Sequence, residues 1–327
     1  MAAAARESRV KTRFTEAFGV EVPVVQGGLA HLAHWELCAA VSAAGGLGQL
    51  TALTMDSPEE LREEIGEVRA RTDRPFALNF ALGRRDVDRY LQVAVDEGVP
   101  AISLTAGNPA PIFEALRGAK IKKIVLTASV RQAQKCEELG ADAVIAVGYE
   151  GGGHLGRDDI GGLVLIPRIV RSVSLPVLAS GGIAGGDQLA AALAMGAEGI
   201  EMGTRFVATL ECRAHAQYKQ ALVAGHETDT AIIERSLGRP GRALRSSVTD
   251  ACIAAEAAGA SEAELYPLFS GESNKRAALE GELEQGFVWA SQGMGLIDDV
   301  PSVAELLQRI VRECAEAAAR VQGALAD

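Results

Sequence analysis

The sequence lacks the features of a disulfide-stapled, secreted or membrane-spanning protein. Its five cysteines are widely spaced and form no C-x-x-C pair, so a disulfide framework is not expected and a reducing compartment fits better. No apolar run approaches the roughly 20 residues that a membrane-spanning helix needs. The N-terminal residues also lack the apolar segment of a secretory signal. We therefore expect a cytoplasmic protein with no membrane segment.

Basic charge and aromatic side chains are also scarce. The 327 residues carry 32 Lys and Arg against 43 Asp and Glu, a formal net charge of −11, and only 4% of them are aromatic. Because nucleic-acid phosphates bind to basic faces, this balance argues against a nucleic-acid partner. The chain is 48% hydrophobic with 36 glycines, which excludes a disordered chain and favours a closely packed α/β fold. The expected partner is a small-molecule substrate.

The sequence does contain a regular succession of short apolar runs. Eight of them begin roughly 25 residues apart, the size of one strand and one crossover helix. They lie at 22–26, 46–50, 75–80, 101–105, 123–127, 143–147, 176–180 and 199–203. The runs are almost wholly apolar, as expected for parallel strands that are covered on both faces. Eight units predict a (β/α)8 TIM barrel. An open doubly wound sheet is the competitor, and the absence of G-x-G-x-x-G after the first run weighs against it.

Helical patterns fill the spaces between these runs. Segment 58–71 has Ser57 before it and Pro58 at its first position, both of which are helix start signals. Segments 130–139 and 187–195 each stop at a glycine, which is a common end signal. These helices alternate with the apolar runs through the first two-thirds of the chain, as a barrel requires.

Beyond residue 224 the alternation breaks, with helical stretches and no strand-like run in 225–286. We therefore predict three parts. The barrel occupies residues 1–224, a small helical cap or substrate domain occupies 225–290, and a C-terminal segment occupies 291–327. The last part contains an amphipathic helix over 302–320 that packs back on the barrel.

In such a barrel the active site lies at the C-terminal ends of the strands, with phosphate held after strands seven and eight. Strand seven is followed by Ser180-Gly181-Gly182-Ile183-Ala184-Gly185-Gly186, which leads directly into a helix. Glycines let the backbone approach an anion, and the helix N-terminus offers free N–H groups. Strand eight is followed by Gly203-Thr204-Arg205, which can complete a phosphate site.

The other strand ends carry amides rather than carboxylates. Gln26-Gly27-Gly28 follows strand one, Asn79 ends strand three, and Thr105-Ala106-Gly107-Asn108 follows strand four. Amide side chains and backbone N–H groups match the carbonyls and ring nitrogens of an isoalloxazine. The expected cofactor is therefore FMN rather than a sugar phosphate.

Strand six leads into a glycine-rich segment with one histidine, Tyr149-Glu150-Gly151-Gly152-Gly153-His154. Its glycines let the backbone lie against a flat ring, and His154 is placed for proton transfer near neutral pH. We predict that His154 is the catalytic acid or base. A metal site is not expected, because Gly151–Gly153 form no rigid helix face and no further ligands follow.

The remaining candidates are assigned weaker roles. His31 and His34 are interpreted as capping or surface residues, and Cys212 with His215 is half a metal site without a partner pair. Four arginines form a loose basic stripe that is interpreted as a salt-bridging face, although it is also the one place where nicotinamide phosphates could dock: Arg235, Arg239, Arg242 and Arg245.

Taken together, the motifs resemble those of the nitronate monooxygenase (2-nitropropane dioxygenase-like) family. They are QGG at 26–28, AGGLG at 44–48, AGN at 106–108, EGGGHLG at 150–156, SGGIAGG at 180–186 and EMGTRFVAT at 201–209. The likeness extends over nearly the whole chain. The same superfamily holds FMN-dependent NADH:quinone reductases and enoyl-ACP reductases.

This resemblance implies a TIM barrel with non-covalent FMN, no catalytic metal, and His154 as the base near the flavin. Its flavin contacts fall on Gly27, Asn79, Gly153, Ser180, Gly181, Gly182, Gly203 and Thr204, beside the Gly28 predicted above. The family's C-terminal A-G-Q segment matches Ala290-Ser291-Gln292, so Gln292 joins the cofactor site with Ser291 in place of the usual glycine.

The motifs leave the reaction open between two hypotheses. The leading hypothesis, and the expected function, is FMN-dependent oxidation of alkyl nitronates by O2 to carbonyl compounds and nitrite. The second is an NAD(P)H-dependent reductase of quinones or enoyl thioesters. Leu126 and the short loop 82–86 weigh against a quinone reductase. Val147 stands where relatives often have Gln or Glu, which removes one flavin hydrogen bond. Segment 141–156 resembles the corresponding segment of the enoyl reductases. A flavin-loaded protein without turnover is a third, weaker hypothesis. The sequence does not fix the oligomeric state, and a homodimer is compatible with it.

Overall fold

The computed structural model describes residues 10–82 and 87–326. Most of the loop predicted at 82–86 therefore lies outside the described residues, as do the first nine residues of the N-terminal segment. Within the described parts, each of the eight predicted apolar runs forms a strand. They are β1 (Val24–Gln26), β2 (Gly48–Thr51), β3 (Phe76–Ala81), β4 (Ala101–Thr105), β5 (Lys122–Thr127), β6 (Ala143–Val147), β8 (Val177–Ser180) and β9 (Ile200–Met202).

These strands form the predicted TIM barrel. All pairings in the sheet are parallel, and the order is β1-β9-β8-β6-β5-β4-β3-β2. A further parallel bridge between Val25 and Leu47 joins β1 to the residue before β2 and brings the two ends of the sheet together. One part of the barrel interior is an apolar cluster, and the stacked rings of Phe14 and Phe18 pack against this cluster from α1 (Arg13–Phe18).

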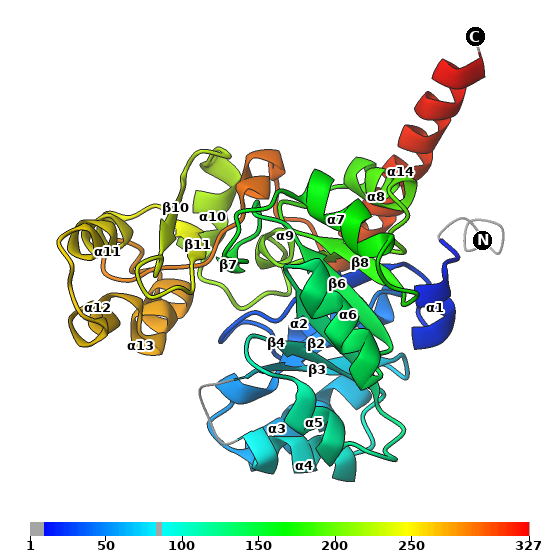
Figure 1. Ribbon diagram of the computed structural model, residues 1–327, viewed down its shortest axis with the longest axis horizontal. Coiled ribbons are helices and arrows are strands. Elements are labelled where there is room, and N and C mark those ends of the chain that lie inside the picture. The colour runs from blue at the N-terminus through cyan, green and yellow to red at the C-terminus, as the bar shows by residue number, and fades with distance from the viewer. Residues whose placement is uncertain (1–9, 83–86, 327) are drawn as a thin grey trace.

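Helices cover the outside of the barrel, and a larger core lies between them and the strands (Figure 1). They are α2 (Trp35–Ala43), α3 (Pro58–Arg69), α4 (Val87–Asp96), α5 (Ala110–Ala115), α6 (Val130–Leu139), α7 (Gly162–Val170) and α8 (Gly186–Ala194). Two further helices, the short α9 (Thr204–Val207) and α10 (Ala216–Ala224), contact the later segment Gln292–Leu296. The predicted helix signals are confirmed: the Ser57 hydroxyl accepts from the Glu60 amide, and Gly140 ends α6 with φ +87°.

After the barrel, the chain forms a lobe that contains both strands and helices, whereas we predicted a purely helical cap. The hairpin β10 (Thr230–Ile233) and β11 (Gly241–Leu244) is antiparallel, and β11 also pairs with β7 (Gly153–His154). The expectation that residues 225–286 contain no strand was therefore wrong. We call this hairpin and its helices the cap; Figure 1 shows it to one side of the barrel, with β7 between them.

The helices of the cap and of the C-terminal segment complete the chain. They are α11 (Ser247–Ala257), α12 (Glu262–Phe269), α13 (Gly271–Lys275), the π-turn Arg276–Glu280, the 3-10 turn Gln292–Leu296 and α14 (Val303–Ala326). The helix α14 covers the predicted segment 302–320 from its second residue onward and extends beyond it. It packs on α8, and its last turns project from the body (Figure 1). None of the described helices is both long and apolar enough to span a bilayer.

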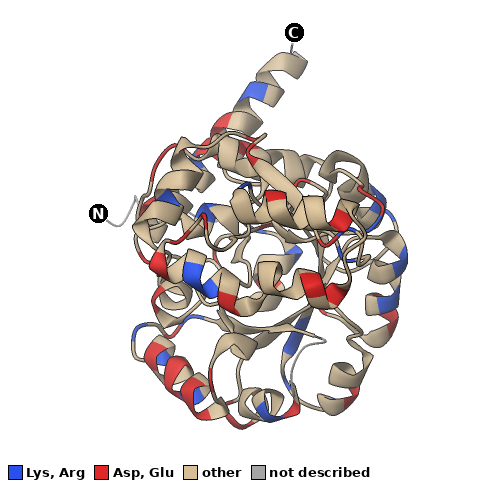
Figure 2. Ribbon diagram, turned by 90° about the vertical axis from the view of Figure 1, so that its left-hand side faces the viewer, with Lys and Arg blue, Asp and Glu red and all other residues tan. Residues whose placement is uncertain are grey.

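Charges of the two signs are mixed on the surface. The view onto the cap side shows acidic and basic segments interspersed rather than gathered into two faces (Figure 2).

One substitution tests the account of the outer helices. Gly66 lies inside α3, is exposed, and an added Cβ there would meet no atom within 4 Å. Gly66→Ala is expected to raise the free energy of unfolding by about 0.5–1 kcal/mol, because alanine loses less backbone entropy in a helix. Urea denaturation measures it. Gly140→Ala is the contrasting control. An added Cβ at Gly140 would also meet no atom within 4 Å, but the residue has φ +87°, which alanine rarely adopts, so this variant is expected to lower the free energy of unfolding.

Candidate active site

A layer of polar side chains from the first four strands crosses the barrel. Gln26 Oε1 accepts from the backbone N–H of Gln49 at 2.9 Å. Asn79 Nδ2 donates to Ser103 Oγ at 2.8 Å, and Ser103 Oγ donates to Gln49 Oε1. All four residues are buried. Among the described residues Gln49 Nε2 has no acceptor. A buried donor without an acceptor is costly, so the layer is suited to a polar ligand.

Glycines bring the first turn close to this layer. An added Cβ at Gly28 would lie 2.2 Å from Asn79 Oδ1, and one at Gly27 would lie 3.2 Å from Glu201 Oε1. The structure therefore brings Gly27, Gly28 and Asn79 together, as the sequence predicts. Sequence reasoning missed Gln49 and Ser103, although each is a polar residue in an apolar strand, which is the signal that singled out Asn79.

The turn after β8 lies against the turn after β6. Gly181 has φ +99° and Gly182 has φ +72°. Added Cβ atoms would lie 2.8 Å from Gly148 O and 2.9 Å from Glu150 Cβ, respectively, so only glycine fits at these positions. Within residues 10–82 and 87–326, the backbone N–H groups of Gly181, Gly182 and Ile183 have no protein acceptor. Three adjacent donors of this kind can hold an anion.

The N-terminus of α8 does not offer the free N–H groups that the sequence analysis expected. Gln188 Oε1 accepts from the amides of Ala184 at 2.6 Å and Gly185 at 3.2 Å, and Glu313 Oε2 accepts from Gly186 at 2.9 Å. An added Cβ at Gly186 would lie 2.0 Å from Ile310 O. This part of the prediction was wrong: Gly186 allows α14 to pack closely, and the Glu313 carboxylate occupies the positive helix end.

The C-terminal segment closes over both turns. The Ser291 amide donates to Thr204 Oγ1 at 2.9 Å, and the Gln292 amide donates to Glu150 O at 2.9 Å. An added Cβ at Gly152 would lie 2.7 Å from Ser291 N. The structure thus brings Gly203, Thr204 and Gln292 beside the glycine turns.

Arg205 is a structural residue rather than part of an anion site. It is almost fully buried, and its Nη2 donates to Ala208 O and to Asp299 O, each at 2.7 Å. Burial lowers the pKa of Arg205, partly offset by the charge of Asp299, whose carboxylate lies 3.3 Å from Nη1. Arg205 therefore ties the turn after β9 to the segment that precedes α14.

His154 lies at the junction of barrel and cap. Its strand β7 pairs with β11, where His154 faces Gly241, and the next amide, Leu155 N, donates to Pro240 O at 2.8 Å. The His154 side chain is 39% exposed, so a substrate can reach it. Its ring centroid lies 5.2 Å from that of Trp289. The site therefore combines a reachable imidazole with an aromatic wall.

A buried carboxylate lies behind this histidine. Glu234 Oε1 is 3.7 Å from His154 Nε2, and the Glu234 side chain is 1% exposed. Burial alone would raise the pKa of Glu234, but the interaction with His154, followed by the hydrogen bond and charge of Arg239, outweighs burial and holds the pKa below its ordinary value. Sequence reasoning missed both Glu234 and Trp289, which are far from His154 in the chain.

Glu150 does not form a metal pair with His154, in agreement with the sequence interpretation. Its two carboxylate oxygens accept from the Gly162 amide at 3.0 and 2.9 Å and so cap α7. His215 likewise caps α10 by accepting from the Gln217 amide at 3.2 Å, and Cys212 is buried. Among the described residues, neither belongs to a group whose ligand atoms are close enough together to hold a metal ion.

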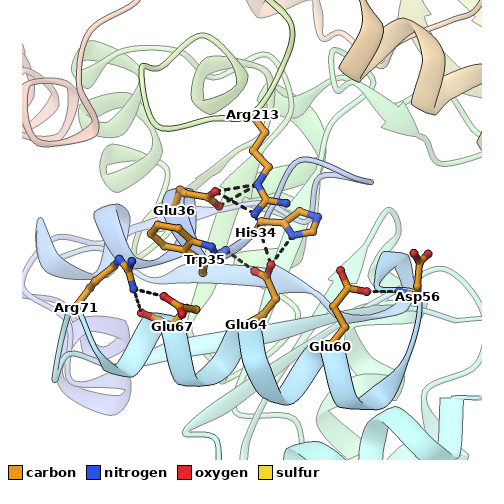
Figure 3. Close-up of polar contacts among 9 residues, drawn as sticks. All are labelled: His34, Trp35, Glu36, Asp56, Glu60, Glu64, Glu67, Arg71 and Arg213. Atoms are coloured by element: carbon orange, nitrogen blue, oxygen red, sulfur yellow. Dashed lines mark hydrogen bonds and ion pairs between the residues drawn. The ribbon is translucent and has the colours of Figure 1, made fainter.

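In the described part of the chain, one group of side chains has ligand atoms close enough for a metal ion: His34, Glu60 and Glu64, within 4.8 Å of one another. His34 Nδ1 lies 2.8 Å from Glu64 Oε1, and Arg213 Nη2 lies 3.6 Å from the same oxygen (Figure 3). The guanidinium of Arg213 therefore already supplies the positive charge that a metal ion would bring to these carboxylates. The group is therefore an ion-pair network. The predicted surface role of His34 was wrong, because the side chain is buried in that network. His34 does occupy the N-cap position of α2, as the capping alternative expected, although its side chain makes no cap bond.

The arginine stripe is a salt-bridging face, as the sequence analysis preferred. Arg235 pairs with Asp159 at 3.1 Å, Arg239 with Glu234 at 2.6 Å, and Arg245 with Asp250 at 2.8 Å. The fourth, Arg242, is buried and donates to Thr230 Oγ1 and to Tyr149 O. Because each guanidinium already has a protein partner, the stripe offers little for nicotinamide phosphates.

Glu201 is an unexpected acid inside the barrel. Its side chain is buried beside the predicted cofactor turns, and Ser180 Oγ donates to Oε2 at 2.7 Å. Burial raises the pKa of Glu201 from 4.5 to about 7, although the Ser180 hydrogen bond opposes the shift. Between these two values the folded protein keeps a proton that the unfolded chain has lost, so the free energy of unfolding falls as pH rises from 4.5 to about 7.

Glu201→Gln removes this dependence. Relative to the wild type, the variant is expected to gain about 3 kcal/mol of stability between pH 4.5 and pH 8, since one pKa unit corresponds to about 1.4 kcal/mol. Urea titrations across this range measure the gain. Glu63→Gln, which alters an exposed carboxylate in α3, should show no such gain. A gain of equal size in both variants would mean that the Glu201 carboxyl is not the source of the pH dependence.

Comparison with known proteins identifies relatives over most of the chain. The family model described as "Nitronate monooxygenase" matches residues 11–89 and 78–313. A nitronate monooxygenase from Pseudomonas aeruginosa is 33% identical over 92% of this chain and 98% of its own length. FabK from Thermotoga maritima superposes with a TM-score of 0.91 at 39% identity, over 96% of this chain and 99% of its own.

Two further relatives have names that describe two different activities. A (3aS,4S,5R,7aS)-5-hydroxy-7a-methyl-1-oxo-octahydro-1H-indene-4-carboxyl-CoA dehydrogenase from Rhodococcus jostii is 31% identical, over 94% of this chain and 96% of its own. A nitroalkane oxidase from Streptomyces ansochromogenes superposes with a TM-score of 0.81 at 29% identity, over 95% of this chain and all of its own. The relatives therefore share one fold and divide between nitro compounds and acyl thioesters.

Proposed function

The chain belongs to the nitronate monooxygenase family, a family of flavin-dependent oxidoreductases, and we propose that it is an FMN-dependent enoyl-thioester reductase that uses NAD(P)H. The observation that carries this proposal is the match to FabK, an enoyl-ACP reductase. In the same structural comparison, identity with FabK is 39% against 29% with the nitroalkane oxidase, and the TM-score is 0.91 against 0.81.

A second relative supports a thioester substrate. The Rhodococcus jostii protein is named as a dehydrogenase of a carboxyl-CoA, which is also an acyl thioester. Two relatives that align over nearly the whole chain thus share this chemical class of substrate. More than nine-tenths of this chain is covered in each case, so the likeness extends over both the barrel and the cap.

The residues at the strand ends fit FMN. The turn after β8 offers three backbone donors and positive-φ glycines that admit no side chain, which suits a phosphate that lies against the backbone. The layer formed by Gln26, Gln49, Asn79 and Ser103 supplies amide groups, including the unpaired Gln49 Nε2, for the polar edge of a ring. We propose that Gly27, Gly28, Gly153, Ser180, Gly203, Thr204 and Gln292 complete this binding site.

The reaction adds a hydride to the β-carbon and a proton to the α-carbon of the enoyl thioester, and it oxidises NAD(P)H to NAD(P)+. FMN, when bound, supplies the hydride that originates on NAD(P)H. His154 supplies the proton, because it is the reachable acid–base group beside the predicted flavin turns. Trp289 lines one side of the imidazole and offers an apolar surface for the acyl chain.

The test is turnover by the FMN-replete protein. Purified protein with NADH or NADPH and a 2-butenoyl thioester, carried by CoA or by acyl carrier protein, should yield the saturated thioester in equal amount to the nicotinamide oxidised. Mass spectrometry identifies the product. If neither nicotinamide is consumed with either carrier, the proposed function is wrong.

Oxidation of alkyl nitronates by O2 is the second candidate. It is favoured by the family model and by the 33% identity with the Pseudomonas aeruginosa enzyme. In this reaction His154 removes the α-proton when a neutral nitroalkane is the substrate. Aerobic turnover of propionate 3-nitronate with release of nitrite, together with no consumption of NAD(P)H, would support this candidate over the first.

A further inference from the structure

The cap holds the catalytic histidine of the barrel by a backbone ladder. His154 pairs with Gly241 and Gly153 with Arg242, so β7 is the third strand of the cap sheet. The two strands β10 and β11 are joined by residues 234–240, which begin with Glu234 and end with Pro240, the acceptor for Leu155 N. The turn of the cap hairpin therefore lies directly beside His154.

The carboxylate of Glu234 is built into this turn. Glu234 has φ +60°, a left-handed conformation that is uncommon for any residue except glycine and costs on the order of 1 kcal/mol. Its side chain is 1% exposed, and Oε2 accepts from Arg239 Nε at 2.6 Å. Arg239 Nη2 in turn pairs with Glu262 at 2.7 Å. The surroundings thus fix a strained, buried carboxylate with its other oxygen toward His154.

The contact with the imidazole is specific to one nitrogen. Glu234 Oε1 lies 3.7 Å from His154 Nε2, within ion-pair range and longer than a hydrogen bond. Such catalytic contacts are often long in the absence of substrate and shorten in the reacting complex. Trp289 limits the ring on another side, with centroids 5.2 Å apart, and its own backbone pairs with Ala243 of β11.

We propose that Glu234 is a positioning residue that keeps a proton on Nε2 of His154, so that Nδ1 is the nitrogen that gives its proton to the substrate. This inference rests on the proposed role of His154 as proton donor. A carboxylate on Nε2 stabilises the imidazolium before transfer and the Nε2–H tautomer after it. The proton leaves Nδ1 for the α-carbon, and the neutral ring remains hydrogen-bonded to Glu234.

A purely structural role for Glu234 makes a different prediction. In that case the carboxylate only neutralises Arg239, and the loss of either partner of Arg239 should have similar effects. Glu262→Gln is the matched control, because it removes the other, exposed carboxylate of Arg239 and leaves the contact with His154 intact. Differences between the Glu234 and Glu262 variants therefore report on the histidine.

The tautomer can be measured without any substrate. In the FMN-bound chain labelled with ¹⁵N-histidine, two-bond nitrogen–proton spectra at about pH 9, where imidazoles are neutral, show which nitrogen carries the proton. His154→Gln identifies the signal. We expect the Nε2–H form in the wild type and in Glu262→Gln, and a substantial Nδ1–H population in Glu234→Ala. A wild-type signal from the Nδ1–H form, or no change in Glu234→Ala, would overturn the proposal.

The two half-reactions of Glu234→Gln supply a second measurement, because this variant keeps the shape of the side chain. Flavin reduction by NAD(P)H should stay within about twofold of the wild type, whereas the step with the enoyl thioester should slow on the order of 10- to 100-fold, less than the whole contribution of a general acid. Equal slowing of both steps, or equal slowing in Glu262→Gln, would contradict the proposal. A wild type that reduces no enoyl thioester would refute the proposed function. The tautomer measurement, which needs no substrate, would still decide whether Glu234 positions the proton on His154.

Discussion

Replacing His154 by glutamine is expected to slow the reduction of an enoyl thioester on the order of 10²- to 10⁴-fold, the usual contribution of a positioned general acid. The glutamine side chain has a similar reach but gives no proton. FMN should still bind, because His154 stands at the junction with the cap and not in the glycine turns. The measurement is the single-turnover rate with the thioester after the flavin has been reduced.

His226→Gln is the control for this experiment. His226 is exposed and lies between α10 and β10, so its loss should change neither rate. If His154→Gln keeps more than half of the wild-type rate, then another group supplies the proton. A variant that loses FMN as well would instead place His154 among the residues that maintain the binding turns.

Gly181→Ala is expected to lower the affinity for FMN about 100-fold. Its methyl group would lie 2.8 Å from Gly148 O and 3.2 Å from Gly151 N, at a φ of +99° that alanine rarely adopts. The two turns must then separate at a cost of up to about 3 kcal/mol, which corresponds to about two factors of ten in binding. Fluorescence titration of the FMN-free protein measures the dissociation constant.

The matched control is Gly140→Ala, at the end of α6. Its φ of +87° imposes a similar strain, but an added Cβ would meet no atom within 4 Å. This variant should lose stability and retain wild-type affinity for FMN. Equal loss of FMN in both variants would mean that backbone strain alone, and not the closeness of the two turns, governs binding.

The barrel could be predicted from local patterns because its strands are buried on both faces. Apolar runs such as 101–105 and 143–147 coincide with β4 and β6, and the Ser57-Pro58 start of α3 and the Gly140 end of α6 are confirmed. The hairpin in the cap was missed. In β11 a buried arginine, Arg242, interrupts the apolar run, whereas β10 carries three apolar residues, 231–233, whose strand signal the sequence analysis missed.

The site was predictable where its residues are adjacent in the chain. The glycine turns and His154 follow barrel strands, and the structure brings them together. Glu234 and Trp289 approach His154 only because the hairpin pairs with β7, a long-range contact that no local spacing reveals. The error at α8 has the same origin, since the Glu313 carboxylate that occupies its N-terminus comes from α14.

The central claim, that a flavin at these turns passes electrons from NAD(P)H to an enoyl thioester, can be tested directly in one anaerobic experiment. NAD(P)H should bleach the FMN absorbance of the purified protein, and a 2-butenoyl thioester added without oxygen should restore it. The account predicts both changes, with the second slowed in His154→Gln. No bleaching by either nicotinamide, with nitrite released from a nitronate in air, would contradict it.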